Sequence, residues 1–140
     1  MAKHSPGQHI QINATGTIDA AQGQLQSKTI ALNAGTDIST QAATVVAQDQ
    51  LKLTSQNLIN NQQGQLNSQD IILSAQQLDN SQGKIQHTGN NEFTLNFVKG
   101  LNNKSGEISS NAALMQLNTS ILNNEARPNY SLWKSAIEYQ

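Results

Sequence analysis

An eight-residue phrase returns six times along the chain, and this repetition constrains the fold more than any single residue does. The phrase has an aliphatic residue, two small polar residues, a two-residue gap, a glycine or alanine, one spacer and a second aliphatic residue. In the sixth copy Pro128 removes the final strand-forming position. A repeat of about 20 residues is typical of a solenoid in which each repeat forms one coil. The phrases begin at Ile18, Ile38, Ile59, Leu78, Leu101 and Leu122.

A second apolar pair lies between successive phrases, with one polar residue separating its two members. Alternation with a period of two indicates a strand that is buried on one face. We therefore predict an all-β fold, a parallel β-helix (β-solenoid) of about six coils of roughly 20 residues, whose coils stack to form a narrow core. The apolar pairs are Ile10/Ile12, Ile30/Leu32, Leu51/Leu53, Ile71/Leu73, Phe93/Leu95 and Met115/Leu117.

The small residue of each phrase is expected to occupy a tight turn, where glycine tolerates a positive φ and alanine does so poorly. The turns at Ala43 and Ala126 should therefore differ from the other four. The third phrase position carries asparagine in four consecutive coils, which predicts a ladder of stacked amides, although asparagine also suits turns by itself. These structural positions are Gly23, Gly64, Gly83, Gly106, Asn61, Asn80, Asn103 and Asn124.

The interval from Leu78 to Leu101 is the longest between phrases, and its extra residues lie in the stretch from 87 to 92. This stretch has the composition of a turn, so it predicts a loop that bulges from the stack. Simple length variation explains such a loop, and so does recognition of a partner. The candidate contact residues are His87, Asn90, Asn91 and Glu92.

The chain divides into a lead-in (1–9), the repeat region (10–128) and a tail (129–140) that we expect to be free of strands. Pro128 should end strand pairing. In the tail, Leu132, Trp133, Ala136 and Ile137 would share one face of a helix, with Asn129 or Ser131 as its N-cap. Such a helix would cap the open end of the solenoid; a transition to a next segment and a partner-binding patch are the alternatives.

Composition excludes several function classes. The net charge is -1 and charged residues make up 12% of the chain, which argues against nucleic acid as a partner. The chain has no cysteine, so we predict no disulfide and no thiolate metal site. Residues 1–9 lack the apolar core of a signal peptide, so export would require a signal on a longer polypeptide.

Catalytic chemistry is not indicated, and we predict neither an enzyme nor a cofactor or metal. Some β-helices act on polysaccharides, but a hydrolase needs two carboxylates within about 9.5 Å of each other. Asp19 and Asp79 share a phrase position three coils apart, about 14 Å at 4.8 Å per coil. The single arginine, Arg127, lies at the terminal break. The three histidines, His4, His9 and His87, have no ligand spacing, so we expect them on the surface.

The phrase Leu-Asp-Asn-Ser-Gln-Gly-Lys-Ile at 78–85, with its relatives at 59–66 and 101–108, resembles the repeats of filamentous haemagglutinin. Similar repeats form the stalk of contact-dependent growth-inhibition toxins and other large exoproteins of two-partner secretion. The resemblance covers the chain from about residue 10 to residue 124. It implies a right-handed β-helix, exported through an outer-membrane transporter and displayed on the bacterial surface. The matching positions build the coil, so the resemblance assigns no binding residue.

Two functions are therefore expected before any other. One is a structural and adhesive stalk segment of a secreted or surface-displayed haemagglutinin or adhesin, a class linked to virulence. Its partners would be a receptor or glycan on a host or bacterial cell. The alternative is a passive stem that presents the receptor-binding and toxin domains of a growth-inhibition toxin. The open ends of the solenoid also predict self-association through unpaired strand edges.

Overall fold

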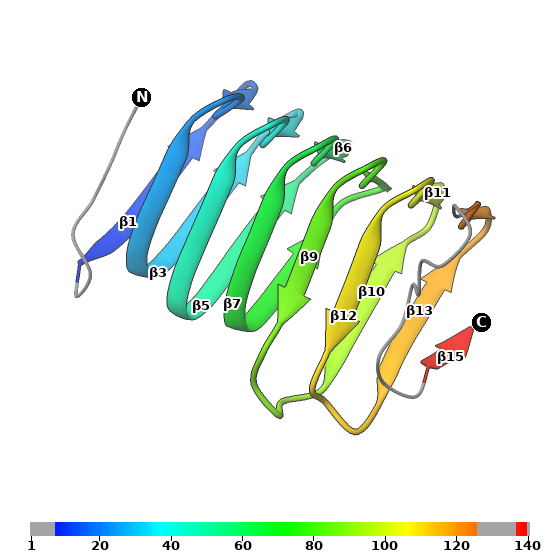
Figure 1. Cartoon of the computed structure of the whole chain (residues 1–140). Helices are drawn as coiled ribbons and strands as arrows, with labels where there is room; N and C mark the ends of the chain where they lie inside the picture. Colours follow the sequence, from blue (N-terminus) through cyan, green and yellow to red (C-terminus); the bar gives the residue numbers. More distant parts are fainter. Residues whose placement is uncertain (1–7, 126–136, 140) are drawn as a thin grey trace.

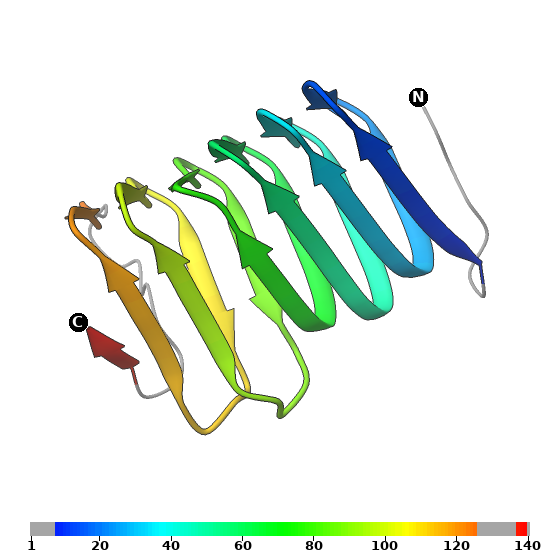
Figure 2. The same cartoon turned by 180° about the vertical axis from the view of Figure 1, so that it is seen from behind.

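The computed structural model describes residues 8–125 and 137–139, and this part of the chain is all-β with no helix. Parallel strands stack coil upon coil into a β-solenoid, which confirms the predicted fold, with about five turns where about six coils were predicted (Figures 1 and 2). In Figure 1 the chain descends along the front of each coil and ascends along the back while the coils advance toward the C-terminus. The same ascending strands lie in front in Figure 2, so the coil is right-handed.

Two parallel sheets form the walls of the solenoid. The larger sheet has nine strands and the smaller has six. The larger contains β1 (His9–Ala14), β3 (Gln24–Ala34), β5 (Thr44–Ser55), β7 (Gln65–Ser74), β9 (Lys84–His87), β10 (Phe93–Phe97), β12 (Glu107–Ser110), β13 (Met115–Thr119) and β15 (Ile137–Tyr139). The smaller contains β2 (Ile18–Asp19), β4 (Ile38–Ser39), β6 (Leu58–Asn60), β8 (Gln77–Asp79), β11 (Gly100–Asn102) and β14 (Leu122–Asn123).

The repeated phrase determines the register of the smaller sheet. Its leading aliphatic residues pair directly across all six strands, from Ile18 on β2 to Leu122 on β14. The average coil is therefore about 21 residues long, close to the predicted period. Because the register is kept in every coil, each phrase position forms a column that runs along the solenoid.

The core consists of such columns. The leading aliphatic residues form one column, and the terminal aliphatics form a second that includes Leu25, Val45 and Leu66. The alternating apolar pairs supply two more columns, and most of their members are at most 2% exposed. No coil could bury its own apolar residues without its neighbours, so stacking is the source of stability.

The strands of the larger sheet are longer than the sequence predicts. In β3, β5 and β7 the strand around the terminal aliphatic and the strand with the alternating pair are one continuous element. At the corner β5 contains one extra residue, because the step from Ala47 to Gln50 pairs with Ser27 to Thr29 on β3 and with Ser68 to Asp70 on β7. A β-bulge lets a strand turn a corner without losing its pairing, so these coils need no separate turn there.

The tight turns follow a different rule from the one predicted. The positive φ lies one residue before the small residue, at Gln22, Ala42, Gln63, Gln82 and Ser105, with values of 54–61°. The N–H of each small residue then donates to the carbonyl three residues earlier at 2.9–3.0 Å, as in a type II turn. Ala43 closes this turn like the glycines do, so the expectation that its turn differs is wrong. Ala126 lies outside the described residues.

This geometry gives opposite expectations for two neighbouring alanines. Replacing Ala42 by glycine should stabilise the fold by about 0.5–1 kcal/mol, because alanine is strained at its φ of 54°. Replacing Ala43 by glycine should destabilise it by about 1 kcal/mol, because Ala43 is 2% exposed and packs in the core. Urea unfolding of both variants checks this pair, and equal shifts in one direction would contradict the assignment of the strained position.

The tail contains a strand, contrary to prediction. Ile137–Tyr139 form β15, which pairs in parallel with β13 and places Ile137 opposite Met115 and Tyr139 opposite Leu117. The residues Ile137 and Tyr139 repeat the alternating apolar pair at the spacing of one coil, a signal that the break at Pro128 hid. The predicted helix and cap at 129–136, and the expected end of pairing at Pro128, lie outside the described residues.

Candidate functional site

The second phrase position caps the turn that follows it. In all six phrases its side-chain oxygen accepts the backbone N–H two residues later, at 3.0–3.4 Å. Aspartate, asparagine and serine form such turns readily, which explains why the position alternates among them. The capping residues are Asp19, Ser39, Asn60, Asp79, Asn102 and Asn123.

The third phrase position forms the predicted amide ladder. Asn61 Nδ2 donates to Asn80 Oδ1 at 2.7 Å, and Asn80 Nδ2 donates to Asn103 Oδ1 at 2.7 Å. Asn103 Nδ2 continues the ladder to Asn124 Oδ1 at 3.2 Å, while Thr40 Oγ1 begins it by donating to Asn61 Oδ1 at 2.7 Å. The first three asparagines are 0% exposed. The ladder thus supplies hydrogen-bond partners to side-chain amides whose burial without partners would be destabilising.

In the three coils with a buried ladder asparagine, the ladder explains why the turn carries glycine. A Cβ on Gly64, Gly83 or Gly106 would lie 2.4–2.5 Å from the Oδ1 of the asparagine in its own coil. The same Cβ would lie 2.3 Å from a backbone carbonyl oxygen of the preceding coil. Glycine is therefore required for space beneath the ladder. Where Thr40 replaces asparagine, the turn carries Ala43.

The insertion loop follows β9 and presents three of the four predicted contact residues. Asn90, Asn91 and Glu92 are exposed, between the end of β9 and the start of β10. His87 is 1% exposed, so placing it on the surface or in the contact loop was wrong. It occupies an inward position of β9, where the aligned residues of the neighbouring coils are Ser68 and Ser110. Loop composition identified the exposed residues, but it concealed that the strand continues to His87.

His87 lies in a polar cluster inside the solenoid. Its Nδ1 is 2.9 Å from Ser110 Oγ, and its Nε2 is 3.7 Å from Asp70 Oδ1. Burial lowers the pKa of His87 below its ordinary value, and the nearby Asp70 carboxylate opposes this shift only in part. Serine, histidine and aspartate also form catalytic triads. Here Ser110 is 4% exposed and its Oγ accepts the N–H of Ala112, so the hydroxyl is not presented to a substrate.

The acidic residues considered for hydrolysis have structural partners. Asp19 and Asp79 occupy one column with Ser39 and Asn60 between them, so they lie three coils apart as predicted. Asp79 Oδ2 accepts Gln62 Nε2 at 2.7 Å in addition to its turn contacts. Among residues 8–125 and 137–139, no group of three or more potential ligands could hold a metal ion. The same residues contain no helix long and apolar enough to span a membrane.

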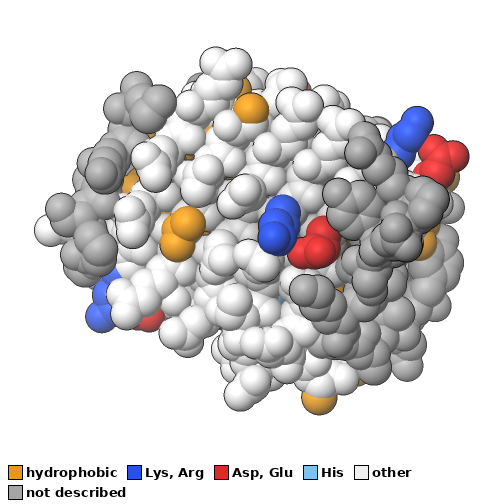
Figure 3. Space-filling model, viewed as in Figure 1, with side chains coloured by type: hydrophobic (Ala, Val, Ile, Leu, Met, Phe, Trp, Pro, Cys, Tyr) orange, Lys and Arg blue, Asp and Glu red, His pale blue; other side chains and the backbone are white. Residues whose placement is uncertain are grey.

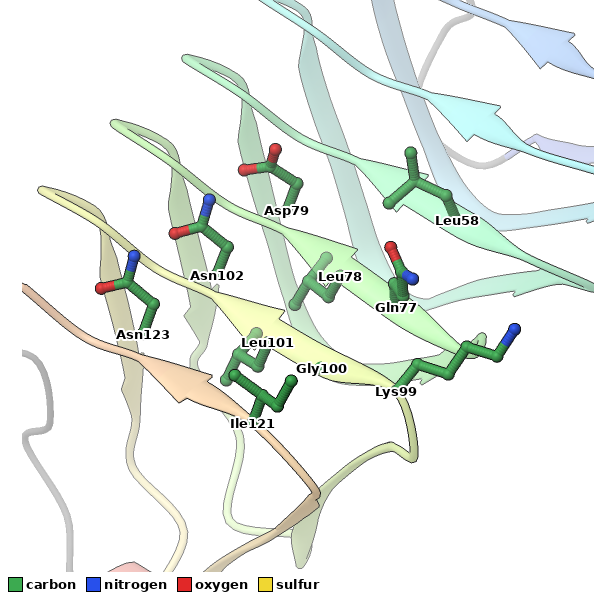
Figure 4. A pocket seen from close by; sticks show the side chains of 10 residues that line it. All are labelled: Leu58, Gln77, Leu78, Asp79, Lys99, Gly100, Leu101, Asn102, Ile121 and Asn123. Carbon is green, nitrogen blue, oxygen red and sulfur yellow. The ribbon is translucent and has the colours of Figure 1, made fainter.

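A shallow groove of about 390 Å³ crosses the outer face of the smaller sheet (Figure 4). Gly100 pairs with Gln77 and has no side chain, so it leaves a notch between neighbouring coils. In Figure 4 Asp79, Asn102 and Asn123 stand in a row on one side, and Lys99 extends at the other end of the strands. Ile121, which is 65% exposed, adds an apolar surface to the groove. Sequence reasoning missed this groove because the notch depends on how the coils align.

The remaining outer surface is polar and sparsely charged. In the face shown in Figure 3, white side chains and backbone predominate, with a few apolar groups and with basic groups that lie next to acidic ones. Cross-coil contacts join many outward side chains, such as Gln63 to Gln82 at 3.1 Å and Asn67 to Gln86 at 2.9 Å. The exposed ion pair Lys28–Asp49, at 3.9 Å, contributes little to stability.

Comparisons of the chain with family models, with curated proteins and with solved structures give no match. The functional argument therefore depends on the repeat and on the site geometry.

Proposed function

We propose that this chain is a structural and adhesive stalk segment of a large secreted or surface-displayed bacterial exoprotein. The single observation that carries the proposal is the way in which the phrase is used. Its aliphatic, capping, ladder and turn positions all build the coil, and the coils add length along one axis. A polypeptide whose repeated residues all serve to lengthen a solenoid is suited to extend away from a surface.

The resemblance to filamentous haemagglutinin repeats supports the same function. In such a protein, an outer-membrane two-partner-secretion transporter would export the parent polypeptide, and this segment would reside outside the cell. The receptor would be a protein or glycan on a host or bacterial cell. Asn90, Asn91 and Glu92 are the contacts we assign to it, because they project from the longest interruption of the stack and are exposed.

A passive stem is the second candidate. It is favoured by the outward amides that bond to one another across coils, as Gln63 and Gln82 do, because such side chains leave fewer groups for a partner. In this function the segment would separate the receptor-binding and toxin domains of a growth-inhibition toxin from the cell. A polysaccharide-active enzyme is a distant third, since the carboxylates of Asp19 and Asp79 occupy structural turns.

Cell binding by the purified chain distinguishes an adhesin from a passive stem. We expect the parent chain to bind epithelial or bacterial cells, and we expect a variant with Asn90→Ala, Asn91→Ala and Glu92→Ala to lose at least about tenfold in affinity. A loss of about 1.4 kcal/mol of binding free energy from these polar contacts produces a tenfold change in affinity. Flow cytometry of labelled protein on both cell types measures it.

The matched control carries Asn13→Ala, Asn33→Ala and Glu125→Ala, which remove the same side-chain types from exposed positions outside the loop. This control should bind like the parent chain. Equal loss in both variants would contradict a specific contact loop. Absence of binding by the parent chain to every cell type would favour the passive stem.

A further inference from the structure

The inward-facing column of residues at the corner of the larger sheet contains one residue that is much larger than its neighbours. Its members pair in register from coil to coil, and four of the five are serine or alanine. The fifth is His87, which is 1% exposed. A small side chain suffices to build this corner, so an imidazole is not required for the fold. The column contains Ser27, Ala47, Ser68, His87 and Ser110.

His87 also closes the base of the insertion loop. It is the last residue of β9, and Phe93 is the first residue of β10, so the two flank residues 88–92. Their rings stack with centroids 4.5 Å apart and an interplanar angle of 8°. This stack joins the two ends of the loop, while Ser110 on β12 anchors the imidazole to the next coil at 2.9 Å. The backbone N–H groups of Thr88 and Gly89 donate to Ser68 O and Gln69 O of the preceding coil at 2.9 Å, so these two residues are held without the imidazole. Removing His87 from the core would therefore release the remaining part of the loop, residues 90–92.

The surroundings of the His87 imidazole offer little stabilisation to its protonated, charged form. Asp70 on β7 is the one charged group within ion-pair distance of it among the described residues, and Phe93 and Ser110 do not titrate. Asp70 Oδ2 already accepts Gln50 Nε2 at 3.1 Å, and the buried His87 Nε2 has no hydrogen-bond partner. At 3.7 Å, Asp70 Oδ1 is beyond hydrogen-bond distance of Nε2. Burying a charged imidazole there costs more than burying a neutral one.

We propose that His87 is an acid-sensitive latch, which holds the loop at 90–92 closed when its ring is neutral and releases it when the ring is protonated. This device is a property of the chain itself and does not depend on the proposed adhesive function. In the released state the imidazole leaves the core, the stack on Phe93 is lost, and Asn90, Asn91 and Glu92 change position. The rest of the stack stays closed, because the other members of the column do not titrate.

The sign of the effect follows from linkage. The closed state binds the proton less readily than the open state, because burial lowers the pKa of His87. Stability of the closed loop is therefore complete at neutral pH and declines as the pH falls below the ordinary histidine value of about 6.5. Between pH 7.5 and pH 5.0, one such histidine can raise the opening equilibrium constant by at most about 30-fold.

Site-directed spin labelling tests the latch directly. The chain has no cysteine, so Asn91→Cys accepts a single nitroxide label on the loop. We expect the ratio of mobile to immobile label to rise between about 5- and 30-fold from pH 7.5 to pH 5.0, within the limit for one histidine. In the same background, His87→Gln should abolish this rise, while His9→Gln, which alters an exposed histidine, should leave it unchanged.

Three outcomes would overturn the proposal: a flat pH response in the labelled parent chain, a rise that persists in His87→Gln, or a rise that disappears in His9→Gln. Should His87→Gln fail to fold, the NMR titration of His87 in the parent chain decides the matter. An NMR-derived pKa below 6.5, with loop resonances that shift along the same titration curve, would support the latch. A value at or above 6.5 would reject it.

Discussion

Replacing Asn80 by alanine is expected to destabilise the solenoid by about 3–5 kcal/mol. The change removes a donor and an acceptor from the middle of the buried ladder, so Asn61 Nδ2 loses its 2.7 Å acceptor and Asn103 Oδ1 loses its 2.7 Å donor. Each buried polar group left without a partner costs about 1–3 kcal/mol, and the cavity adds to this cost. Urea unfolding followed by circular dichroism measures the effect.

Asn102 provides the control for this prediction. It is an asparagine of the next coil, on the outer face, and its Oδ1 caps the N–H of Lys104 at 3.2 Å. Water can replace that contact, so Asn102→Ala should cost about 1 kcal/mol or less. Hydrogen exchange should also show lost protection in the coils on both sides of Asn80. Equal costs for the two variants would mean that the ladder contributes no more than a turn cap.

The strength of the sequence prediction lies in periodicity. Six copies of one phrase specify stacked coils, because the aliphatic residues of a single copy cannot be buried without the next copy. The four asparagines in register led to the ladder for the same reason. Both inferences depend only on residues that recur at a fixed spacing, and the structure places those residues opposite one another.

Single residues were harder to predict, because their surroundings come from other coils. His87 stands next to turn-forming residues in the chain, but its burial depends on Asp70, Phe93 and Ser110, which belong to three other strands. The sequence predicts a positive φ for the glycines of the turn, because the identity of a residue indicates its own backbone freedom. It does not indicate which neighbouring atoms leave no room for a side chain. For Gly64, Gly83 and Gly106 the actual constraint is an asparagine side chain three residues earlier and a carbonyl of the preceding coil.

The tail illustrates a third kind of error. Pro128 and the aromatic residues after it indicate an end of the repeat, and the spacing of the apolar residues that follow resembles that of a helix. The pair Ile137 and Tyr139 nevertheless lies one coil after Met115 and Leu117. A search at the coil spacing beyond Pro128 would have found it, because an interruption in one phrase does not abolish the period.

Replacing Gly83 by alanine is the second change for which we expect a large effect, a destabilisation of about 3 kcal/mol. The added Cβ would lie 2.3 Å from the backbone oxygen of Asn61 and 2.4 Å from Asn80 Oδ1. Neither oxygen can move away easily, because the Asn61 backbone oxygen accepts the N–H of Gly64 at 3.0 Å and Asn80 Oδ1 accepts Asn61 Nδ2 at 2.7 Å. Overpacking of a close-packed core costs about 1–3 kcal/mol or more. Urea unfolding compared with Gly16→Ala, whose Cβ would meet nothing within 4 Å, measures this effect.

The coil that contains Thr40 and Ala43 suggests how the effect of Gly83→Ala can be tested further. There the turn accepts alanine beside a threonine that still donates to the ladder at 2.7 Å. Adding Asn80→Thr to Gly83→Ala recreates this pair, so the double variant should be about 1–2 kcal/mol more stable than the sum of the single changes predicts. Purely additive costs would show that the clash with the preceding coil's carbonyl dominates. A Gly83→Ala variant as stable as Gly16→Ala would show that the stack can widen by a few tenths of an ångström, in which case the ladder does not select glycine.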